Sequence, residues 1–186
     1  MSHDEVDVLI VGGGMVGATL GCALGGTALR VAVLETAEPH PYAPEDAHDL
    51  RVSAISIASA SILRTTGAWE GITSRRACPY RRMRVWESLG DVEFRSEEIH
   101  EPVLGHIVEN RIIQLAVLER LKAFSNVELV CPAVTKKIEY KKDGSIVELQ
   151  DGRRFKARLL VAADGGLSQV RQAAGMGVSG WDYQQH

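Results

Sequence analysis

Three glycines near the amino terminus have the spacing of a turn that binds phosphate groups. Gly12, Gly14 and Gly17 form a G-x-G-x-x-G pattern directly after the apolar run 6–11. The first glycine permits a tight turn, the second lets a pyrophosphate approach the backbone, and the third lets a helix pack closely on a strand. The free N–H groups at the start of that helix would face the phosphates. The pattern therefore indicates a dinucleotide site.

A carboxylate follows these glycines at the distance expected of a ribose ligand. Residues 30–34 read as a second strand, which ends in Glu35, about 20 residues after Gly14. A carboxylate there accepts hydrogen bonds from the ribose hydroxyls and repels a 2′-phosphate, which favours FAD or NAD over NADP. Taken alone, Glu35 is equally well explained as a solvated residue, so the inference depends on its combination with the glycines.

The elements that position these residues are a strand, a turn and a helix rather than a membrane anchor. Residues 8–29 carry no charged side chain, and about 20 apolar residues suffice to cross a bilayer. However, each interior glycine costs a helix roughly 0.8–1 kcal/mol relative to alanine, and the acidic flank 4–7 is unlike a signal peptide. We expect a strand over 6–11 and a helix over about 14–25, whose glycine stripe lies close to the sheet.

The composition is that of an ordinary globular chain. It has 186 residues, 45% of them apolar and 24% charged, which predicts one domain or slightly more. The formal net charge of −3 gives no overall attraction to nucleic acid. An arginine-rich stretch over 75–84 is followed by the acidic stretch 93–101, so we interpret it as a solvated surface rather than a nucleic-acid or lipid site.

The cysteines point to a reducing compartment. Cys22, Cys78 and Cys131 are odd in number, far apart, and form no C-x-x-C pair. This pattern argues against a disulfide framework or a zinc site and suits a cytoplasmic protein without a metal centre. We expect all three to be small buried hydrophobic residues.

Two further helices are expected before the chain turns to strands. One is capped by Ser56 or Ser59 and stopped by Gly67. The other is capped by Asn110 and covers about 111–124.

A change of hydrophobic period marks the last third of the chain. Strands are predicted over 127–131, 133–142, 145–150 and 153–157, and a buried strand over 158–163 follows. The sequence thus predicts an α/β fold: a Rossmann-like domain with a parallel sheet and an inserted antiparallel β-meander. A plain NAD dehydrogenase would continue to alternate strand and helix, so the meander favours a flavoprotein.

Two other features have two interpretations each. Asp164 and Gly165 close a strand and open a helix, where they could meet a cofactor or simply cap the helix. Arg51 precedes a helix rich in small residues and could contact an anionic cofactor or lie on the surface.

Together, these segments resemble successive motifs of the flavin-dependent aromatic hydroxylases, which have the p-hydroxybenzoate hydroxylase fold. Within that superfamily the chain is most similar to the ubiquinone-biosynthesis hydroxylases, in particular the octaprenylphenol hydroxylase group. The motifs are VDVLIVGGGMVGATLGCAL, LRVAVLE, LRVSAIS, GHIVEN and LLVAADGGLSQVR, with the terminal WDYQQH.

The resemblance implies a monooxygenase that uses FAD, NAD(P)H and O₂ to hydroxylate the ring of a small aromatic substrate, a prenylated phenol. It implies no side chain here as catalytic acid or base. It also implies that Arg51 lies near the cofactor's phosphate or flavin, and that Val134 offers its backbone to the adenine. The full set of implied cofactor residues is Gly12, Gly14, Met15, Val16, Gly17, Glu35, Arg51, Asn110, Arg111, Val134, Asp164 and Gly165.

Members of this family are about twice as long as this chain, so we expect an N-terminal portion. Residues 1–178 would form the FAD/NAD(P)-binding domain, and 179–186 would begin the substrate domain. The portion alone is expected to be inactive. A cytoplasmic protein, peripheral contact with the inner membrane or a biosynthetic complex, and a homo-oligomer are all consistent with the resemblance; a nucleic-acid partner is not expected. The alternatives are a stand-alone, non-catalytic dinucleotide-binding module and, less favoured, an NAD-dependent dehydrogenase.

Overall fold

Four parallel strands bring the residues of the predicted site to one edge of a sheet. The computed structural model describes residues 4–181, so most of the terminal WDYQQH motif lies outside the described residues. The six-stranded sheet has the order β8-β2-β1-β11-β10-β9, and its first four strands are parallel. They are β1 (Asp4–Val11), β2 (Val31–Leu34), β8 (Val127–Val130) and β11 (Arg154–Ala162). All four residues of β2 are buried, as expected where a parallel sheet is covered on both faces.

The predicted meander is present, but its limits differ from the prediction. β9 (Thr135–Lys141) and β10 (Gly144–Leu149) pair antiparallel, and β10 pairs antiparallel with β11. The predicted strand over 127–131 is not part of the meander, because β8 pairs in parallel with β2. The segments 153–157 and 158–163 are one continuous strand, β11, which pairs with β10 along its first half and with β1 along most of its length. The α/β fold class is confirmed.

Two helices cover one face of the parallel strands. α1 (Met15–Ala23) and α4 (Asn110–Leu121) share a core with β1 and β2. A Cβ atom on Gly21 would lie 2.9 Å from both Val33 and Leu121, so the glycine stripe does let α1 pack closely on its neighbours. α1 has only nine residues, and no helix within residues 4–181 is long and apolar enough to cross a membrane.

The middle of the chain forms a second sheet that the sequence analysis did not predict. β3 (Val52–Ser56), β7 (Gly105–Glu109) and β4 (Cys78–Tyr80) pair antiparallel in that order. Beside them lie α2 (Ile57–Thr65) and α3 (Trp69–Thr73). The capping prediction for α2 is confirmed, since the Ser56 hydroxyl accepts a hydrogen bond from the Ser59 N–H and Gly67 follows with a φ of +80°.

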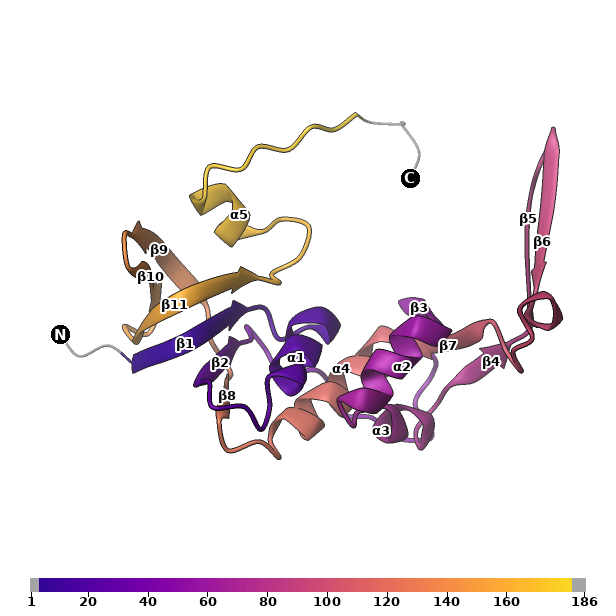
Figure 1. The fold of residues 1–186 in the computed structure, drawn as a ribbon, viewed down its shortest axis with the longest axis horizontal. Helices are drawn as coiled ribbons and strands as arrows, with labels where there is room; N and C mark the ends of the chain where they lie inside the picture. Colours follow the sequence, from indigo (N-terminus) through magenta and orange to yellow (C-terminus); the bar gives the residue numbers. More distant parts are fainter. Residues whose placement is uncertain (1–3, 182–186) are drawn as a thin grey trace.

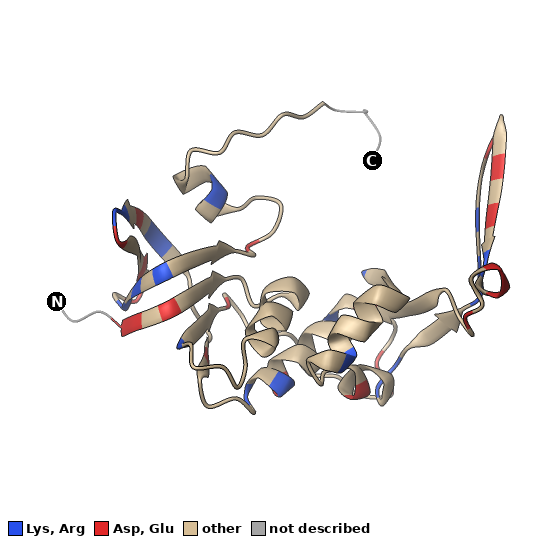
Figure 2. Cartoon of the chain, viewed as in Figure 1, with Lys and Arg blue, Asp and Glu red and all other residues tan. Residues whose placement is uncertain are grey.

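A hairpin extends away from the rest of the molecule at the end opposite the amino terminus (Figure 1). It consists of β5 (Arg82–Glu87) and β6 (Gly90–Arg95), followed by the 3-10 turn η1 (Ser96–Ile99). Both acidic and basic residues lie along it (Figure 2). Four of the five arginines of the predicted basic stretch are ion-paired: Arg75 with Glu119, Arg76 with Glu109, Arg82 with Glu93, and Arg84 with Asp91.

The chain ends beyond a short helix, α5 (Gln169–Ala173), which packs on the meander side of the sheet. Residues 176–181 have no regular secondary structure. The predicted domain boundary at 178 falls in this segment and stays a prediction, because residues 182–186 lie outside the described part.

The expectation that all three cysteines are buried is wrong for one of them. Cys22 is buried in α1, where its thiol donates to the Val117 carbonyl at 3.3 Å, and burial raises its pKa to about 11. Cys131 is half-buried, whereas Cys78 is exposed. The reason is that Cys78 lies on the edge strand β4, which the sequence analysis did not identify.

Candidate functional site

The strand register aligns the candidate residues at the carboxyl edge of the sheet. Val11 pairs with Leu34 and Ala162, and Leu34 pairs with Val130, so four parallel strands end level with one another. Ligands of open α/β sheets bind outside this edge. A cleft of about 450 Å³ lies there. Its walls include six of the predicted residues: Gly12, Gly14, Glu35, Val134, Asp164 and Gly165.

The three glycines of the motif have three different surroundings. Gly12 has a φ of +105°, and a Cβ atom on it would lie 2.2 Å from the Ala163 carbonyl oxygen. A Cβ atom on Gly17 would lie 2.0 Å from the Gly12 carbonyl oxygen, so this position also accepts only glycine. Gly14 has nothing within 4 Å of its Cβ position. Gly12 and Gly17 shape the turn, while Gly14 leaves open space in the cleft wall.

The first turn of α1 faces this open space with its backbone. Gly14 is the N-cap residue and has no side chain to cap the helix, so the N–H groups of the first turn have no side-chain acceptor there. Such N–H groups and the positive end of the helix dipole attract anions. The side chains of Met15 and Val16 point elsewhere, since they line a separate apolar groove of about 260 Å³ with Ile55 and Ile62. Neither Met15 nor Val16 lines the cleft.

Glu35 lies where the sequence predicts a ribose ligand. Its Oε1 atom accepts a hydrogen bond from the Thr36 N–H at 2.8 Å. A Cβ atom on Gly13 would lie 2.8 Å from the Glu35 Cβ, so this carboxylate sits directly against the glycine turn. The sequence analysis missed its other neighbour, Gln114, whose side-chain amide is 3.5 Å from Oε2. Gln114 lies near the start of α4, and no motif in the sequence marks it as facing the site.

The opposite wall of the cleft comes from the meander and from β11. The Val134 carbonyl accepts a hydrogen bond from the Gln150 N–H at 2.9 Å. Asp164 accepts three hydrogen bonds from the start of α5, from the Ser168 hydroxyl and the N–H groups of Gln169 and Val170. Burial raises the pKa of Asp164, but these hydrogen bonds outweigh it and bring the pKa below its usual 3.8. Ser168 is the N-cap residue of α5, and Asp164 helps to cap the same helix by accepting these N–H groups. The expected capped helix start is thus confirmed, and a contact of Asp164 with a cofactor stays a prediction.

Besides Met15, Val16 and Gly17 of α1, three predicted cofactor residues from other segments do not line this cleft. Arg51 is exposed just before β3, and its carbonyl accepts a hydrogen bond from the Asn110 N–H. The prediction that Asn110 caps α4 is wrong, because Glu109 is the N-cap residue. The Asn110 side chain instead accepts a hydrogen bond from the Ser53 hydroxyl at 2.6 Å. The unpredicted strand β3 supplies that donor, so the competing interaction was not visible in the sequence.

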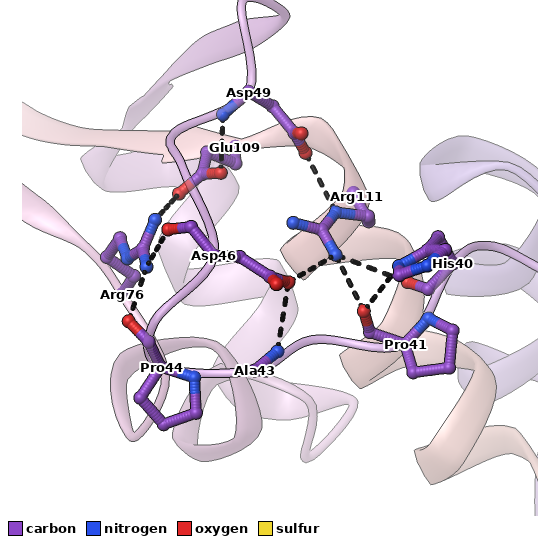
Figure 3. Close-up of polar contacts among 9 residues, drawn as sticks. All are labelled: His40, Pro41, Ala43, Pro44, Asp46, Asp49, Arg76, Glu109 and Arg111. Atoms are coloured by element: carbon purple, nitrogen blue, oxygen red, sulfur yellow. Dashed lines mark hydrogen bonds and ion pairs between the residues drawn. The ribbon is translucent and has the colours of Figure 1, made fainter.

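The third of these residues, Arg111, holds the loop over 40–49 in place (Figure 3). Its guanidinium donates to Asp49 at 2.9 Å, to Asp46 at 3.1 Å and to the Pro41 carbonyl at 2.7 Å. These contacts raise the pKa of Arg111. The Ala43 N–H and Arg111 lower the pKa of Asp46. If Arg111 also contacts a cofactor, it has to do so while keeping these contacts with the 40–49 loop.

Glu109 completes the anchor of the same loop from the end of β7. This buried carboxylate accepts hydrogen bonds from the Asp49 N–H at 2.8 Å and from Arg76 at 3.1 Å. Arg76 also donates to the carbonyls of Pro44 and Asp46 (Figure 3). Within residues 4–181, no group of three or more His, Cys, Asp or Glu side chains could hold a metal ion.

Curated relatives of the chain are enzymes of ubiquinone biosynthesis. It is 40% identical over its whole length to the 3-demethoxyubiquinol 3-hydroxylase of Escherichia coli, of which it covers 48%. It is 37% identical to the ubiquinone hydroxylase UbiL of Rhodospirillum rubrum and 35% identical to the human ubiquinone biosynthesis monooxygenase COQ6, in each case over 99% of this chain. Those alignments cover 43% and 42% of the relatives, so the chain spans about half the length of the curated proteins it matches.

Solved structures of flavin enzymes share the fold. A variant of PqsL from Pseudomonas aeruginosa superposes with a TM-score of 0.77 at 25% identity, over 97% of this chain and 48% of the other. The flavin-dependent monooxygenase PieE, solved with FAD and substrate, gives a TM-score of 0.70 at 18% identity, over 94% of this chain and 33% of PieE. This second likeness is evidence for the fold alone. The family model described as FAD binding domain matches residues 5–185, and the chain therefore belongs to the FAD binding domain family.

Proposed function

We propose that the protein to which this chain belongs is an FAD-dependent monooxygenase that hydroxylates the aromatic ring of a prenylated phenol in ubiquinone biosynthesis. The observation that carries the proposal is the cleft at the carboxyl edge of the sheet, where the open Gly14 backbone and the Glu35 carboxylate line the same cavity. The substrate class rests on the relatives, which are ubiquinone-biosynthesis hydroxylases and align with nearly the whole of this chain.

The cleft fits the adenosine diphosphate half of FAD. Gly14 leaves space where a side chain would otherwise fill the wall, and the first-turn N–H groups of α1 can donate to a pyrophosphate. Glu35 can accept hydrogen bonds from the adenosine ribose, and its negative charge disfavours a 2′-phosphate. The backbone around Val134 borders the cleft on the side where the adenine would lie.

The chemistry of oxygen transfer is supplied by the cofactor when it is bound. The residues of this chain would bind and orient the cofactor. The dipole of α1 would attract the phosphates, and Glu35 would accept hydrogen bonds. The turn at Asp164–Gly165 would form the wall of the cleft beside α5. The described residues that line the cleft include two titratable groups, Glu35 and Asp164, and Asp164 is already engaged in capping. We assign neither of them as a catalytic acid or base.

A matched pair of glycine substitutions tests the cofactor site. Gly14 has an ordinary φ of −67° and nothing near its Cβ position, so Gly14→Ala should fold normally and yet obstruct the pyrophosphate. Gly90→Ala, at the first residue of β6, is the control, because its Cβ position is also open. We expect Gly14→Ala to weaken FAD binding by at least about tenfold, the effect of losing roughly 1.4 kcal/mol. Fluorescence titration with FAD gives the affinities, and equal affinity of wild type and Gly14→Ala would contradict the proposal.

The finer parts of the assignment belong to the same proposal. NAD(P)H is proposed as the reductant, and a cytoplasmic enzyme that meets the inner membrane peripherally suits a substrate with a long apolar prenyl chain. The 186-residue chain by itself is proposed to bind FAD weakly and to lack hydroxylase activity, as a non-catalytic binding module would. Flavin absorbance after desalting, followed by NAD(P)H oxidation with a prenylphenol, tests this. Stoichiometric FAD retention with coupled product formation would show that the chain is sufficient for catalysis.

A further inference from the structure

One polar side chain beside the cleft has no part in the proposed cofactor contacts. Gln114 lies on α4, three residues after Arg111, and is half-buried behind the glycine turn. Its Nε2 atom donates to the Gly13 carbonyl at 3.1 Å and lies 3.5 Å from Oε2 of Glu35. A single amide thus bridges the two halves of the site, which are separated in the sequence by the whole of α1.

The two oxygens of the Glu35 carboxylate are held from different sides. The Thr36 N–H holds Oε1 from within the same turn, and Gln114 approaches Oε2 from another helix. Within residues 4–181, the Glu35 carboxylate also accepts a hydrogen bond from the Ala37 N–H at 3.4 Å. A carboxylate has about four acceptor positions, so it can keep both contacts and still accept hydrogen bonds from a ribose.

We propose that Gln114 is a positioning residue for ribose recognition: it fixes Glu35 and the Gly13 carbonyl so that the carboxylate faces the cleft before the cofactor binds. This inference rests on the proposed FAD site and deepens it. Side chains that bind a ligand hold it more tightly when a neighbouring group has already fixed their rotamer. Glutamate has three side-chain torsions, so much of its rotamer freedom is lost on binding unless a partner restricts it earlier.

The proposal is tested by a double-mutant cycle on FAD affinity with the 186-residue chain. Gln114→Leu removes the donor and puts an apolar side chain of similar bulk in its place, and it should weaken FAD binding by about tenfold. In the Glu35→Ala background the same change should weaken binding less than about twofold, because the residue through which Gln114 acts is gone. Gln114→Glu places a second negative charge beside Glu35 and should weaken binding more than Gln114→Leu. Gln172→Leu, at an exposed glutamine of α5, is the control and should leave the affinity unchanged.

The outcomes separate this inference from the proposed function. If wild type binds FAD and Gln114→Leu binds equally well, the positioning role is overturned while the FAD site stands. If Gln114→Leu weakens binding by the same factor with and without Glu35, Gln114 does not act through Glu35, which also overturns the inference. If wild type binds no FAD and no ADP, both proposals fail. Circular dichroism melting of each variant ensures that folded protein is compared, and Gln114→Glu provides a second test should Gln114→Leu not fold.

Discussion

At the scale of single residues, the structure separates groups that shape the site from groups that can touch a ligand. A Cβ atom on Gly12 or Gly17 would lie 2.2 or 2.0 Å from a backbone oxygen, so these two glycines are needed to form the turn itself. Gly14 and Glu35 border the cleft. Substitutions in the first class should affect unfolding, whereas those in the second should affect binding.

Glu35 provides the sharpest prediction at this scale. Glu35→Ala should leave the melting temperature nearly unchanged, because the side chain stands at the end of β2 and carries no buried ion pair in the described structure. It should weaken FAD binding by roughly 1.5–3 kcal/mol, the usual contribution of hydrogen bonds to a charged group. Titration with FAD and thermal melting measure the two quantities. A large fall in melting temperature with equal affinity would show that Glu35 is structural.

At the scale of elements, the sequence was informative where the chain follows simple periodicity. The strand, glycine turn and helix at the amino terminus agree with the prediction within two residues, as do β2 and the cap of α2. β8 was assigned to the meander because a four-residue apolar strand has the same pattern whether its partner is parallel or antiparallel. Pairing partners are set by tertiary contacts, which a single strand does not encode.

The second sheet and the loop over 40–49 escaped prediction for a similar reason. β3, β4 and β7 are short and mostly lack an alternating pattern, and they are held by pairing between residues up to 57 positions apart, as for Val52 and Glu109. Gln114, Glu109 and Arg111 lie together at one end of α4, but each has partners from a distant segment. Motif spacing found the glycines and Glu35, whereas it could not find side chains that act across elements.

The anchor of the 40–49 loop allows a prediction about Arg111. A lysine cannot reproduce the forked contacts of the guanidinium with Asp46, Asp49 and the Pro41 carbonyl. Arg111→Lys should therefore loosen the loop and speed cleavage after Glu45 several-fold, with a modest fall in melting temperature. Limited digestion with a glutamate-specific protease measures the rate. Arg84→Lys in the hairpin, which removes only the forked contact of an exposed pair with Asp91, is the control. Equal cleavage of both variants would show that Arg111 does not hold the loop.

The turn before α5 gives a prediction about pH. The pKa of Asp164 lies below its usual 3.8, so the folded state binds a proton at this group more weakly than the unfolded chain does. The resulting stability is present above pH 3.8 and is lost as the pH falls through the lower folded value. Asp164→Asn should be less stable than wild type at pH 7, and the difference should shrink below pH 3.8.

Urea unfolding at several pH values measures this difference. Asp143→Asn, which removes one negative charge from an exposed turn, is measured in parallel to subtract the general effect of net charge. A stability difference between wild type and Asp164→Asn that stays constant down to pH 2 would mean that the Asp164 carboxylate does not stabilise α5 through its charge.

At the scale of the whole molecule, the hairpin of β5 and β6 presents two different faces. Met83 pairs with Phe94 and Val85 with Val92, which places four apolar side chains on one face. All four are exposed, between 42% and 55%. The other face carries Arg84 and Asp91, which form an ion pair. Within residues 4–181, β5 and β6 pair only with each other, so both outer edges are also open.

This arrangement predicts that the chain self-associates. A two-stranded hairpin is marginal alone in water, and contiguous exposed apolar surface together with open strand edges favours contact between copies. Sedimentation velocity over a concentration series should therefore show a shift to larger species. Val85→Lys with Val92→Glu should suppress the shift, because the two residues are directly opposite and can form a cross-strand ion pair that preserves the hairpin. Arg84→Glu with Asp91→Arg reverses the charged pair on the other face and should associate as wild type does. A wild-type chain that stays monomeric at every concentration, or an apolar-face variant that associates as strongly as the charge-reversed control, would show that this face does not drive association.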